Sequence, residues 1–510
     1  MLAKVFSAGL LGIEAYPIEI EVDIHKGLPT EVVVGLPDAA VKESKDRVRS
    51  ALHNSGFKYP DEKITINLAP ADVKKEGPSF DLPIALGVLA GSGQMAREDF
   101  SPFLIAGELA LNGAVRPVKG ILSIALMAEK LGGKSLLVPE ANAREAAIVQ
   151  GLKVRGIKNL SQAVKFLQGE IDLEPVRVDP DELFREASTY PVDLADVRGQ
   201  THVKRALEVA VAGGHNLLMI GPPGAGKSML AKRIPTILPP MSLREALETT
   251  RIHSSVGLLG GKQSLIATRP FHSPHHTISD IALIGGGTKI KPGEVSLAHN
   301  GVLFLDELPE FHRNVLEVLR QPLEDGEVTI SRATGSLTFP ARFMLVAAMN
   351  PCPCGYFTDP KRECRCTPGQ IRKYMTKVSG PLLDRIDIHV DVPPVKYREL
   401  SEGALGESSE TVRKRVEKAR RVQRKRFTHS RIHHNAAMGS SHLRKFCALS
   451  REGKDLLRMA MSELGLSARA YDRVLKVSRT IADLEGESDI RESHLSEAIQ
   501  YRTLDRNLWI

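Results

Sequence analysis

The stretch Gly221-Pro-Pro-Gly-Ala-Gly-Lys-Ser228 satisfies the pattern G-x-x-x-x-G-K-[S/T] without a mismatch. The apolar run 216–220 before it predicts a buried strand, and 229–234 after it predicts the start of a helix. A glycine loop in this context turns its backbone N–H groups toward phosphate oxygens, and the helix N-terminus adds a positive dipole. Lys227 would reach the β- and γ-phosphates, and Ser228 would hold Mg²⁺. The alternative is a chance glycine loop, but the flanking elements favour an ATP or GTP site. The predicted nucleotide-binding residues of the loop are Gly221, Pro222, Pro223, Gly224, Ala225, Gly226, Lys227 and Ser228.

A second nucleotide-binding segment follows about 75 residues later, at Gly301-Val-Leu-Phe-Leu-Asp306-Glu307. Its apolar residues predict a buried parallel strand, and the two acids stand at the carboxyl end, where open α/β sheets bind ligands. Asp306 would hold the Mg²⁺ shell, and Glu307 would polarise the attacking water. The alternative is an acidic cap on the next helix, which the upstream glycine loop disfavours.

Three further polar residues are candidates for catalysis. Asn350 ends the apolar run 343–349 and would sense the γ-phosphate, although an Asn before Pro351 also suits an ordinary turn. Arg385, in Gly380-Pro-Leu-Leu-Asp-Arg-Ile-Asp387, would stabilise charge on a neighbouring subunit's γ-phosphate. A local Asp–Arg ion pair is its alternative. Arg469 begins a late helix and would close over the same phosphate.

Composition is that of a globular protein of about three or four domains. The chain has 510 residues, of which 42% are hydrophobic and 25% charged, and its net charge is +8. No apolar run reaches the length of about 20 residues that a membrane span needs, and the N-terminus lacks the apolar core of a signal peptide. Five cysteines indicate no disulfide scaffold, so we expect a reducing, cytoplasmic location and no membrane partner.

The predicted fold class is α/β with four segments. Residues 1–168 alternate strands, such as 18–24, 31–35 and 63–68, with helical periodicity at 40–55. Residues 169–191 are acidic and proline-bearing and predict a linker. Residues 192–395 form the nucleotide-binding α/β core. Residues 396–510 are expected to be helical, forming a linker and a lid.

The order of glycine loop, Asp-Glu strand, Asn strand, Leu-Asp-Arg and late Arg resembles an AAA+ ATPase. Four further segments resemble the magnesium-chelatase-like branch and, within it, the ComM/YifB family: Arg269-Pro-Phe-His-Ser-Pro-His-His276, Leu283–Gly287, Pro292–Gly301 and Asn350–Gly355. The resemblance covers essentially the whole chain. It implies ATP and Mg²⁺ as cofactors, with Lys227, Ser228, Asp306, Glu307 and Asn350 acting in cis, Arg385 as a finger in trans and Arg469 as the lid sensor.

A finger in trans implies a ring, a homo-hexamer by resemblance. The segment from about 251 to 295 corresponds to the insert of this branch, and 328–339 predicts a hairpin with Gly335 in its turn. In related rings such elements face the central pore. His272, His275 and His276 of the insert suggest a metal site, but we favour packing or hydrogen bonding within the insert.

Cys352, Cys354, Cys364 and Cys366 lie within 15 residues of one another, directly after Asn350. Four thiols at close spacing favour a structural, tetrahedral Zn²⁺ site, with Asp359-Pro-Lys-Arg362 as a knuckle. Reduced thiols or a redox-sensitive cluster are the alternatives. Cys447 stands alone and is expected to pack in the core.

The segments Lys75–Pro83 and Gly107–Pro117 resemble the proteolytic domain of Lon, which has the α+β fold of the ribosomal S5 domain 2-like class and uses a Ser–Lys dyad. Ser79 falls at the serine position, whereas Leu122 stands where the lysine is expected and Lys119 lies three residues early. A serine without its base is a poor nucleophile. We therefore expect a Lon-like fold without peptidase activity. The resemblance to the inactive domain of RadA ATPases suggests a second collar of the ring.

From Thr411 to Arg431 there are ten Lys or Arg residues against one acid, Glu417. A solvated helix is the simple interpretation; the functional one is contact with DNA phosphates, largely independent of sequence. The resemblance implies a hexameric DNA motor, a branch-migration helicase in homologous recombination and natural transformation, acting on branched or single-stranded DNA with recombination proteins. The rivals are a chelatase-like ATPase that remodels a protein partner, an ATP-dependent protease and a non-motor regulatory ATPase.

Overall fold

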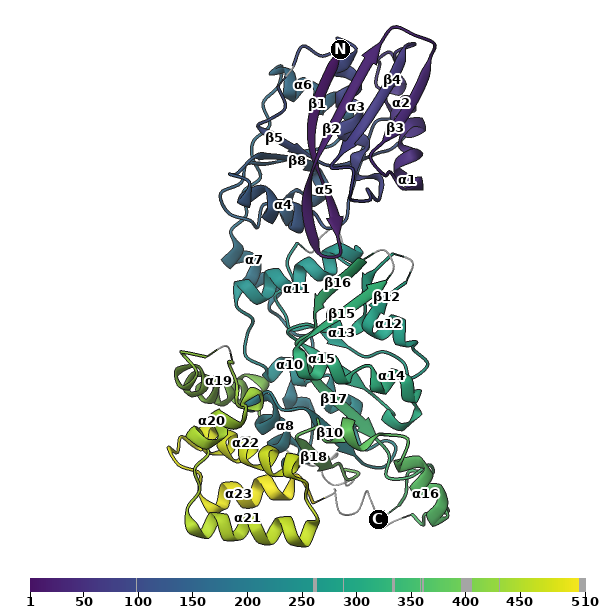
Figure 1. Cartoon of the computed structure of the whole chain (residues 1–510). Coiled ribbons are helices and arrows are strands. Elements are labelled where there is room, and N and C mark those ends of the chain that lie inside the picture. Colours follow the sequence, from purple (N-terminus) through teal and green to yellow (C-terminus); the bar gives the residue numbers. More distant parts are fainter. Residues whose placement is uncertain are drawn as a thin grey trace. The chain divides into compact units, whose positions relative to one another are not determined.

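The computed structural model describes residues 1–97, 99–259, 264–287, 289–332, 335–357, 359, 362–395, 406–430 and 432–503. The chain divides into two compact units. The first unit comprises Met1–Ala187 and Ser242–Ala267, and the second comprises Ser188–Met241 and Thr268–Ile510. Figure 1 shows the first unit mainly in purple and blue and the helical end of the second in yellow.

The first unit begins with a four-stranded sheet in the order β1-β2-β4-β3. Its strands are β1 (Leu2–Leu11), β2 (Glu14–His25), β3 (Thr30–Val34) and β4 (Lys63–Ala69). Only β3 and β4 run parallel. Along β2, Ile18, Ile20, Val22 and Ile24 are buried and alternate with more exposed residues, as a sheet with one covered face requires. Helix α3 (Asp81–Gly91), which is buried along its whole length, packs against β1 and β2.

The predicted helix over 40–55 is interrupted at Glu43. Helix α1 (Ala39–Lys42) ends there, and α2 (Ser44–Asn54) follows directly. The short helix η1 (Pro78–Phe80) precedes α3.

A second, parallel sheet of the first unit has the order β5-β8-β9. It consists of β5 (Phe103–Ile105), β8 (Ser135–Pro139) and β9 (Val154–Ile157), and β6 (Glu108–Leu109) pairs with β7 (Val115–Arg116) beside it. The helices of this part are α4 (Ile121–Lys130), α5 (Glu140–Ala146), α6 (Leu160–Gln168) and α7 (Pro180–Ala187).

Helix α11 (Leu243–Val256) belongs to the first unit, although it lies within the segment predicted as the nucleotide-binding core. It packs against α4, and its Ser254 hydroxyl donates a 2.5 Å hydrogen bond to the buried Glu145 carboxylate. Burial raises the pKa of Glu145, which this hydrogen bond partly offsets. The chain therefore leaves the second unit after Met241 and returns at Thr268.

The second unit is built on a five-stranded sheet in the order β11-β14-β17-β10-β18, in which every neighbouring pair is parallel. The strands are β10 (Leu217–Ile220), β11 (Phe271–His272), β14 (Val302–Leu305), β17 (Met344–Met349) and β18 (Ile388–Asp391). All residues of β10, β14 and β17 are buried, as expected for a parallel sheet covered on both faces. This order places β10 between β17 and β18. Because the strands are parallel, the carboxyl ends of strands that are far apart in the chain lie side by side at one edge of the sheet.

Several short elements surround this sheet. They are η2 (Leu194–Asp196), α8 (Thr201–Gly213), α9 (Lys227–Ala231), α10 (Ile234–Ile237), α12 (Asp280–Ile284), α13 (Glu294–Leu297), η3 (Leu308–Glu310), α14 (Arg313–Glu317), α15 (Arg320–Asp325), α16 (Pro368–Met375) and α17 (Gly380–Leu383). Two small antiparallel hairpins join β12 (Gly285–Gly286) to β13 (Lys291–Pro292) and β15 (Glu327–Arg332) to β16 (Gly335–Pro340). The predicted hairpin is thus present, with Gly335 at the start of β16 and paired with Arg332.

The second unit ends in helices that share its core. They are α19 (Ser409–Arg426), η4 (Asn435–Ala437), α20 (Ser440–Phe446), α21 (Arg451–Leu464), α22 (Ala468–Glu485) and α23 (Glu492–Gln500). Val416, Val474 and Ile481 from these helices lie in one buried cluster with Val203 and Leu207 of α8.

The predicted fold class is confirmed: a mixed α+β segment, a parallel α/β core and a helical end. The domain boundaries at 168, 191 and 395 stay predictions, and residues 396–405 after the last of them lie outside the described residues. No helix in the described ranges combines the length and the apolar character that a membrane span requires.

Candidate active site

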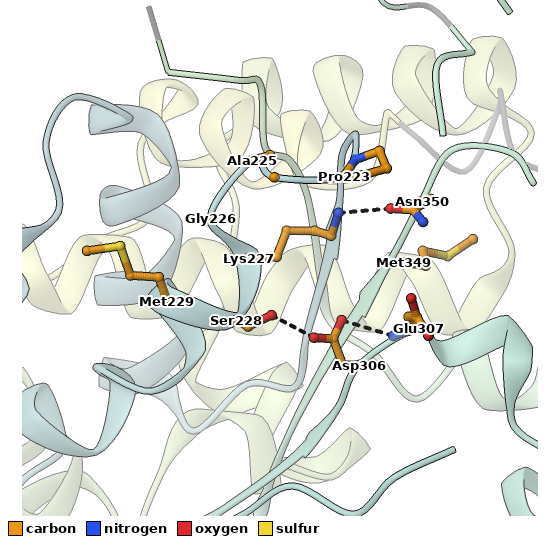
Figure 2. A pocket seen from close by; sticks show the side chains of 11 residues that line it. Pro223, Ala225, Gly226, Lys227, Ser228, Met229, Asp306, Glu307, Met349 and Asn350 are labelled. Atoms are coloured by element: carbon orange, nitrogen blue, oxygen red, sulfur yellow. Dashed lines mark hydrogen bonds between the residues drawn. The ribbon is translucent and has the colours of Figure 1, made fainter. Parts of the chain in front are cut away.

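The glycine loop connects β10 to α9 and forms one wall of a pocket of about 360 Å³. Gly226 has φ 87°, a left-handed conformation that favours glycine, and it precedes the first turn of α9. At Gly221 a Cβ atom would lie 2.2 Å from the Val392 carbonyl oxygen, so the loop passes too close to the end of β18 for any side chain. The pocket is lined by Pro223, Gly224, Ala225, Gly226, Lys227, Ser228, Met229, Asp306, Glu307, Met349 and Asn350 (Figure 2).

Lys227 links the glycine loop to Asn350. Its ammonium donates to the carbonyl oxygens of Gly221 (2.6 Å) and Pro222 (3.0 Å) and to Oδ1 of Asn350 (3.0 Å; Figure 2). Burial lowers the pKa of Lys227, which the carboxylates of Asp306 and Glu307 counteract. Phosphate oxygens are stronger acceptors than these neutral oxygens, so the ammonium is placed to bind a nucleotide's phosphates.

Ser228 and Asp306 bring a hydroxyl and a carboxylate together in the same pocket. The Ser228 hydroxyl donates to Oδ2 of Asp306 at 2.6 Å, and the backbone N–H of Glu307 donates to Oδ1 of Asp306 at 3.0 Å (Figure 2). A hydroxyl and a carboxylate are hard oxygen ligands, which Mg²⁺ prefers when it also binds phosphates. The donor set therefore fits the predicted Mg²⁺.

Glu307 follows β14 with φ 54°, an uncommon left-handed conformation for a residue other than glycine. Its side chain is 55% exposed and lies 3.5 Å from Nδ1 of His276. His272 pairs with Glu294 at 2.7 Å, and Nδ1 of His275 lies 2.9 Å from the Thr277 hydroxyl. His272 and His275 therefore bond within the insert, as predicted. His276 instead contacts Glu307, which lines the pocket.

The two predicted arginines lie outside the residues that line this pocket. Arg385 is 9% exposed; its guanidinium pairs with Glu324 of α15 and donates to the Pro381 carbonyl at 2.5 Å. The adjacent Asp384 instead pairs with Arg469 at 3.3 Å. The structure therefore does not show the alternative, an ion pair between Arg385 and an adjacent aspartate. The role of Arg385 in trans and the role of Arg469 in the lid stay predictions.

A buried network that the sequence did not reveal fastens the helical end to the sheet. His215, just before β10, bonds Asp387 through Nδ1 (3.0 Å) and the Thr480 hydroxyl through Nε2 (2.9 Å). Arg473 of α22 pairs with the same aspartate at 2.6 Å. Burial alone would raise the pKa of Asp387, but Arg473 and His215 hold it below its usual value. Because α22 also carries Arg469, this network positions the predicted lid sensor.

The four cysteines form one cluster, and their Sγ atoms all lie within 4.8 Å of one another. The Sγ atoms of Cys352 and Cys354 are 3.3 Å apart, and those of Cys354 and Cys364 are 3.6 Å apart. Ligands about 2.3 Å from a tetrahedral ion lie roughly 3.8 Å apart, so this donor set fits a metal ion. Backbone hydrogen bonds from Tyr356 and Arg365 lower the pKa of Cys354 to about 6, whereas burial and the neighbouring thiols raise the pKa values of Cys364 and Cys366. The predicted knuckle includes Pro360 and Lys361, which lie outside the described residues.

The loop that carries this cluster packs on the glycine loop. A Cβ atom at Gly355 would lie 2.5 Å from Cδ of Pro223, so the backbone at Gly355 packs directly on the Pro223 ring. Cys447, by contrast, is buried elsewhere in the core, as predicted, and burial raises its pKa to about 12.

In the first unit, Ser79 has no hydrogen-bonded base among the described residues. Its hydroxyl makes no hydrogen bond within the described residues, Leu122 is fully buried, and Lys119 is exposed beside Gly257. An apolar residue at 122 provides no proton acceptor for Ser79. The absence of peptidase activity stays a prediction.

Some of the basic residues of helix α19 form ion pairs with acidic residues of the same chain. Arg415 pairs with Glu208 and Glu407, and Arg426 pairs with Asp483. The exposed residues without an ion-pair partner within the described ranges are Lys418, Arg421, Arg424 and Lys425.

Comparison with known proteins gives matches along almost all of the chain. Family models described as "Magnesium chelatase, subunit ChlI", "Subunit ChlI of Mg-chelatase" and "Magnesium chelatase, subunit ChlI C-terminal" match residues 193–400, 20–142 and 406–502. Competence protein ComM of Haemophilus influenzae is 47% identical over 513 residues, covering 99% of this chain and 98% of that protein. YifB of Escherichia coli is 47% identical over 508 residues with the same coverage. More distantly, the magnesium-chelatase 38 kDa subunit of Acidiphilium rubrum is 26% identical over 336 residues, covering 60% of this chain and 87% of that subunit.

Proposed function

The chain belongs to the ComM/YifB family of magnesium-chelatase-like AAA+ ATPases, and from this premise we propose that it is an ATP-driven motor that acts on DNA. The observation that carries the ATPase is the convergence of three strand ends on one pocket. Lys227 after β10 contacts Asn350 after β17, and Ser228 contacts Asp306 after β14. These contacts support a phosphate cradle and a Mg²⁺ site in one pocket, which Glu307 also lines.

The residues divide the work of hydrolysis. Lys227 and the backbone N–H groups of the loop bind the phosphates, and Ser228 and Asp306 would hold Mg²⁺, which would neutralise part of the phosphate charge. Glu307 orients and polarises the attacking water, and Asn350 contacts the γ-phosphate. Arg385 of a neighbouring subunit stabilises the charge of the transition state, and Arg469 closes from the lid. This division requires a ring, for which we propose a homo-hexamer.

The DNA part of the proposal is supported by two observations. The similar protein of Haemophilus influenzae is named a competence protein. Helix α19 presents Lys418, Arg421, Arg424 and Lys425, which no acid within the described residues neutralises. Exposed, unpaired cations bind phosphates without reading the base sequence. We infer a branch-migration helicase for recombination during natural transformation, working on branched or single-stranded DNA in the cytoplasm with recombination proteins.

We expect a forked or four-way-junction DNA to stimulate ATP turnover several-fold, with less stimulation at higher salt. Each phosphate contact contributes roughly one unit to the slope of log affinity against log salt. Replacing Lys418, Arg421 and Lys425 with Gln should therefore weaken DNA binding and reduce that slope by about three. Steady-state ATPase and DNA-binding titrations at several salt concentrations measure both effects.

The matched control replaces Arg451, Lys454 and Arg458, which are exposed on α21, with Gln. It should leave the slope unchanged. Turnover that no DNA stimulates would contradict the DNA motor and favour the second candidate, a magnesium-chelatase-like ATPase that remodels a protein partner. That candidate rests on the similarity to the magnesium-chelatase 38 kDa subunit, which spans 87% of that protein.

We propose that the four-cysteine cluster holds structural Zn²⁺, because thiolate ligands in tetrahedral sites favour this ion. The double substitution Cys364→Ser and Cys366→Ser should remove one zinc per chain and lower the melting temperature. It should also weaken ATP binding, because the cysteine loop packs on Pro223 of the glycine loop. Elemental analysis, thermal unfolding and nucleotide titration measure these results.

Cys447→Ser is the control, since Cys447 lies apart from the cluster. Purified protein without stoichiometric zinc, together with a double variant that melts like the wild type, would refute the zinc site.

A further inference from the structure

Glu307 is firmly held at its backbone but not at its side chain. The left-handed backbone and the hydrogen bond from its N–H to Asp306 set the direction of the Cα–Cβ bond. The side chain is more than half exposed, and His276 is the one ion-pair partner that it has within the described residues. A carboxylate that polarises water must be held in a narrow range of positions, since small misplacements are costly in rate. His276 is the group in position to provide that restraint.

His276 is itself held on two sides. Its ring lies against that of His275, with centroids 4.1 Å apart, and it meets the edge of the buried Phe311 ring at 6.4 Å and 77°. Its side chain is 31% exposed, so these contacts cover much of the imidazole. An imidazole fixed in this way is a defined partner for a carboxylate, in contrast to a mobile surface side chain.

The fold explains why His276 arrives at this place. Strand β11 lies beside β14 in parallel register, with Phe271 opposite Val302 and His272 opposite Leu303. Parallel neighbours end at the same edge of a sheet, so the residues after β11 and the residues after β14 meet there. Four residues beyond His272, the chain brings His276 to Glu307.

We propose that His276 is a positioning residue for Glu307 in ATP hydrolysis. The imidazole interacts with Oε2, the oxygen it faces at 3.5 Å, and leaves Oε1 to accept a hydrogen bond from the attacking water. The distance is that of an ion pair or a long hydrogen bond, and such contacts tighten when the catalytic complex forms. His276 transfers no proton; it restricts the carboxylate. This inference rests on the ATPase part of the proposed function and is independent of DNA.

The test is the kinetics of His276→Ala and His276→Asn in the absence of DNA. His276→Ala should lower kcat at least about tenfold while the Kd for Mg-ATP stays within twofold. His276→Asn should recover much of the rate, because its amide nitrogen takes the place of Nδ1. In the Glu307→Gln background, His276→Ala should cause little further loss, because the two residues act through one interaction. The control is His272→Asn, which changes a histidine of the same motif that pairs with Glu294.

Four outcomes would overturn the assignment. The first is a wild-type or raised kcat in His276→Ala, and the second is a loss of ATP affinity in that variant as large as its loss of kcat. The third is a kcat of His276→Asn no higher than that of His276→Ala. The fourth is a loss of kcat from His276→Ala that is as large in the Glu307→Gln background as in the wild type. The proposed DNA motor is refuted by a different measurement, an ATPase rate of the wild type that DNA does not stimulate. The failure of one proposal can therefore be distinguished from the failure of the other.

Discussion

Replacing Lys227 with alanine is expected to abolish ATP turnover and to weaken ATP binding by roughly 100-fold or more. Among the described residues that line the pocket, this ammonium is the one side-chain cation, and charge-assisted hydrogen bonds to phosphate are among the strongest that proteins make. Without it, the β- and γ-phosphate charges have Mg²⁺ and backbone N–H groups as partners but no side-chain cation. Titration with a fluorescent ATP analogue and steady-state ATPase assays measure the two effects.

Lys232→Ala is the matched control for this substitution. Lys232 lies five residues further on, at the end of the same short helix, and its side chain is exposed. The control should bind and hydrolyse ATP like the wild type. A Lys227→Ala chain with wild-type affinity and turnover would show that the pocket is not the nucleotide site.

The second large effect is expected for Arg385→Ala, which should lower kcat by roughly 1,000-fold, the lower end of the range for arginine fingers, with ATP affinity retained. In this structure the guanidinium is held by Glu324 and lines no part of its own chain's pocket. That placement suits a residue that serves a neighbouring subunit, because it must then leave its own site free. Single-turnover ATPase assays separate the loss of rate from any loss of binding.

Two further variants decide between a finger and a structural ion pair. Glu324→Gln removes the partner of Arg385 but leaves the arginine, so it should keep most of the activity if Arg385 is a finger. Mixing inactive Arg385→Ala subunits with inactive Glu307→Gln subunits should restore activity, because some interfaces then contain an intact Glu307 and an intact Arg385. The role of Arg385 in trans would be refuted if the mixture recovers no activity and Glu324→Gln loses as much activity as Arg385→Ala.

The glycine loop between a buried strand and a helix could be predicted from the sequence because its conformation is local. Eight consecutive residues from Gly221 to Ser228 determine how the backbone turns, and the flanking apolar runs determine the strand and the helix. Asp306 and Asn350 were also predictable, because each directly follows an apolar run that only a buried strand explains. Parallel strands bring such ends together whatever the loops between them contain.

The cysteine cluster could be predicted from the sequence only in part. Spacing within 15 residues favoured a common site, and the structure brings all four Sγ atoms together. The packing of Gly355 on Pro223 carries no sequence signal, because neither residue forms part of a motif that includes the other.

The sequence by itself therefore determined the glycine loop and the strands that carry the candidate nucleotide-binding residues, and from these it predicts the ligands of Mg²⁺. Only the tertiary structure decided which partners these groups have. His276 meets Glu307, Arg385 meets Glu324, and α11 joins the first unit rather than the second. The physical reason is distance along the chain. A local motif is encoded by the conformations of neighbouring residues, whereas contacts between segments tens of residues apart depend on strand order and packing, which no short pattern specifies.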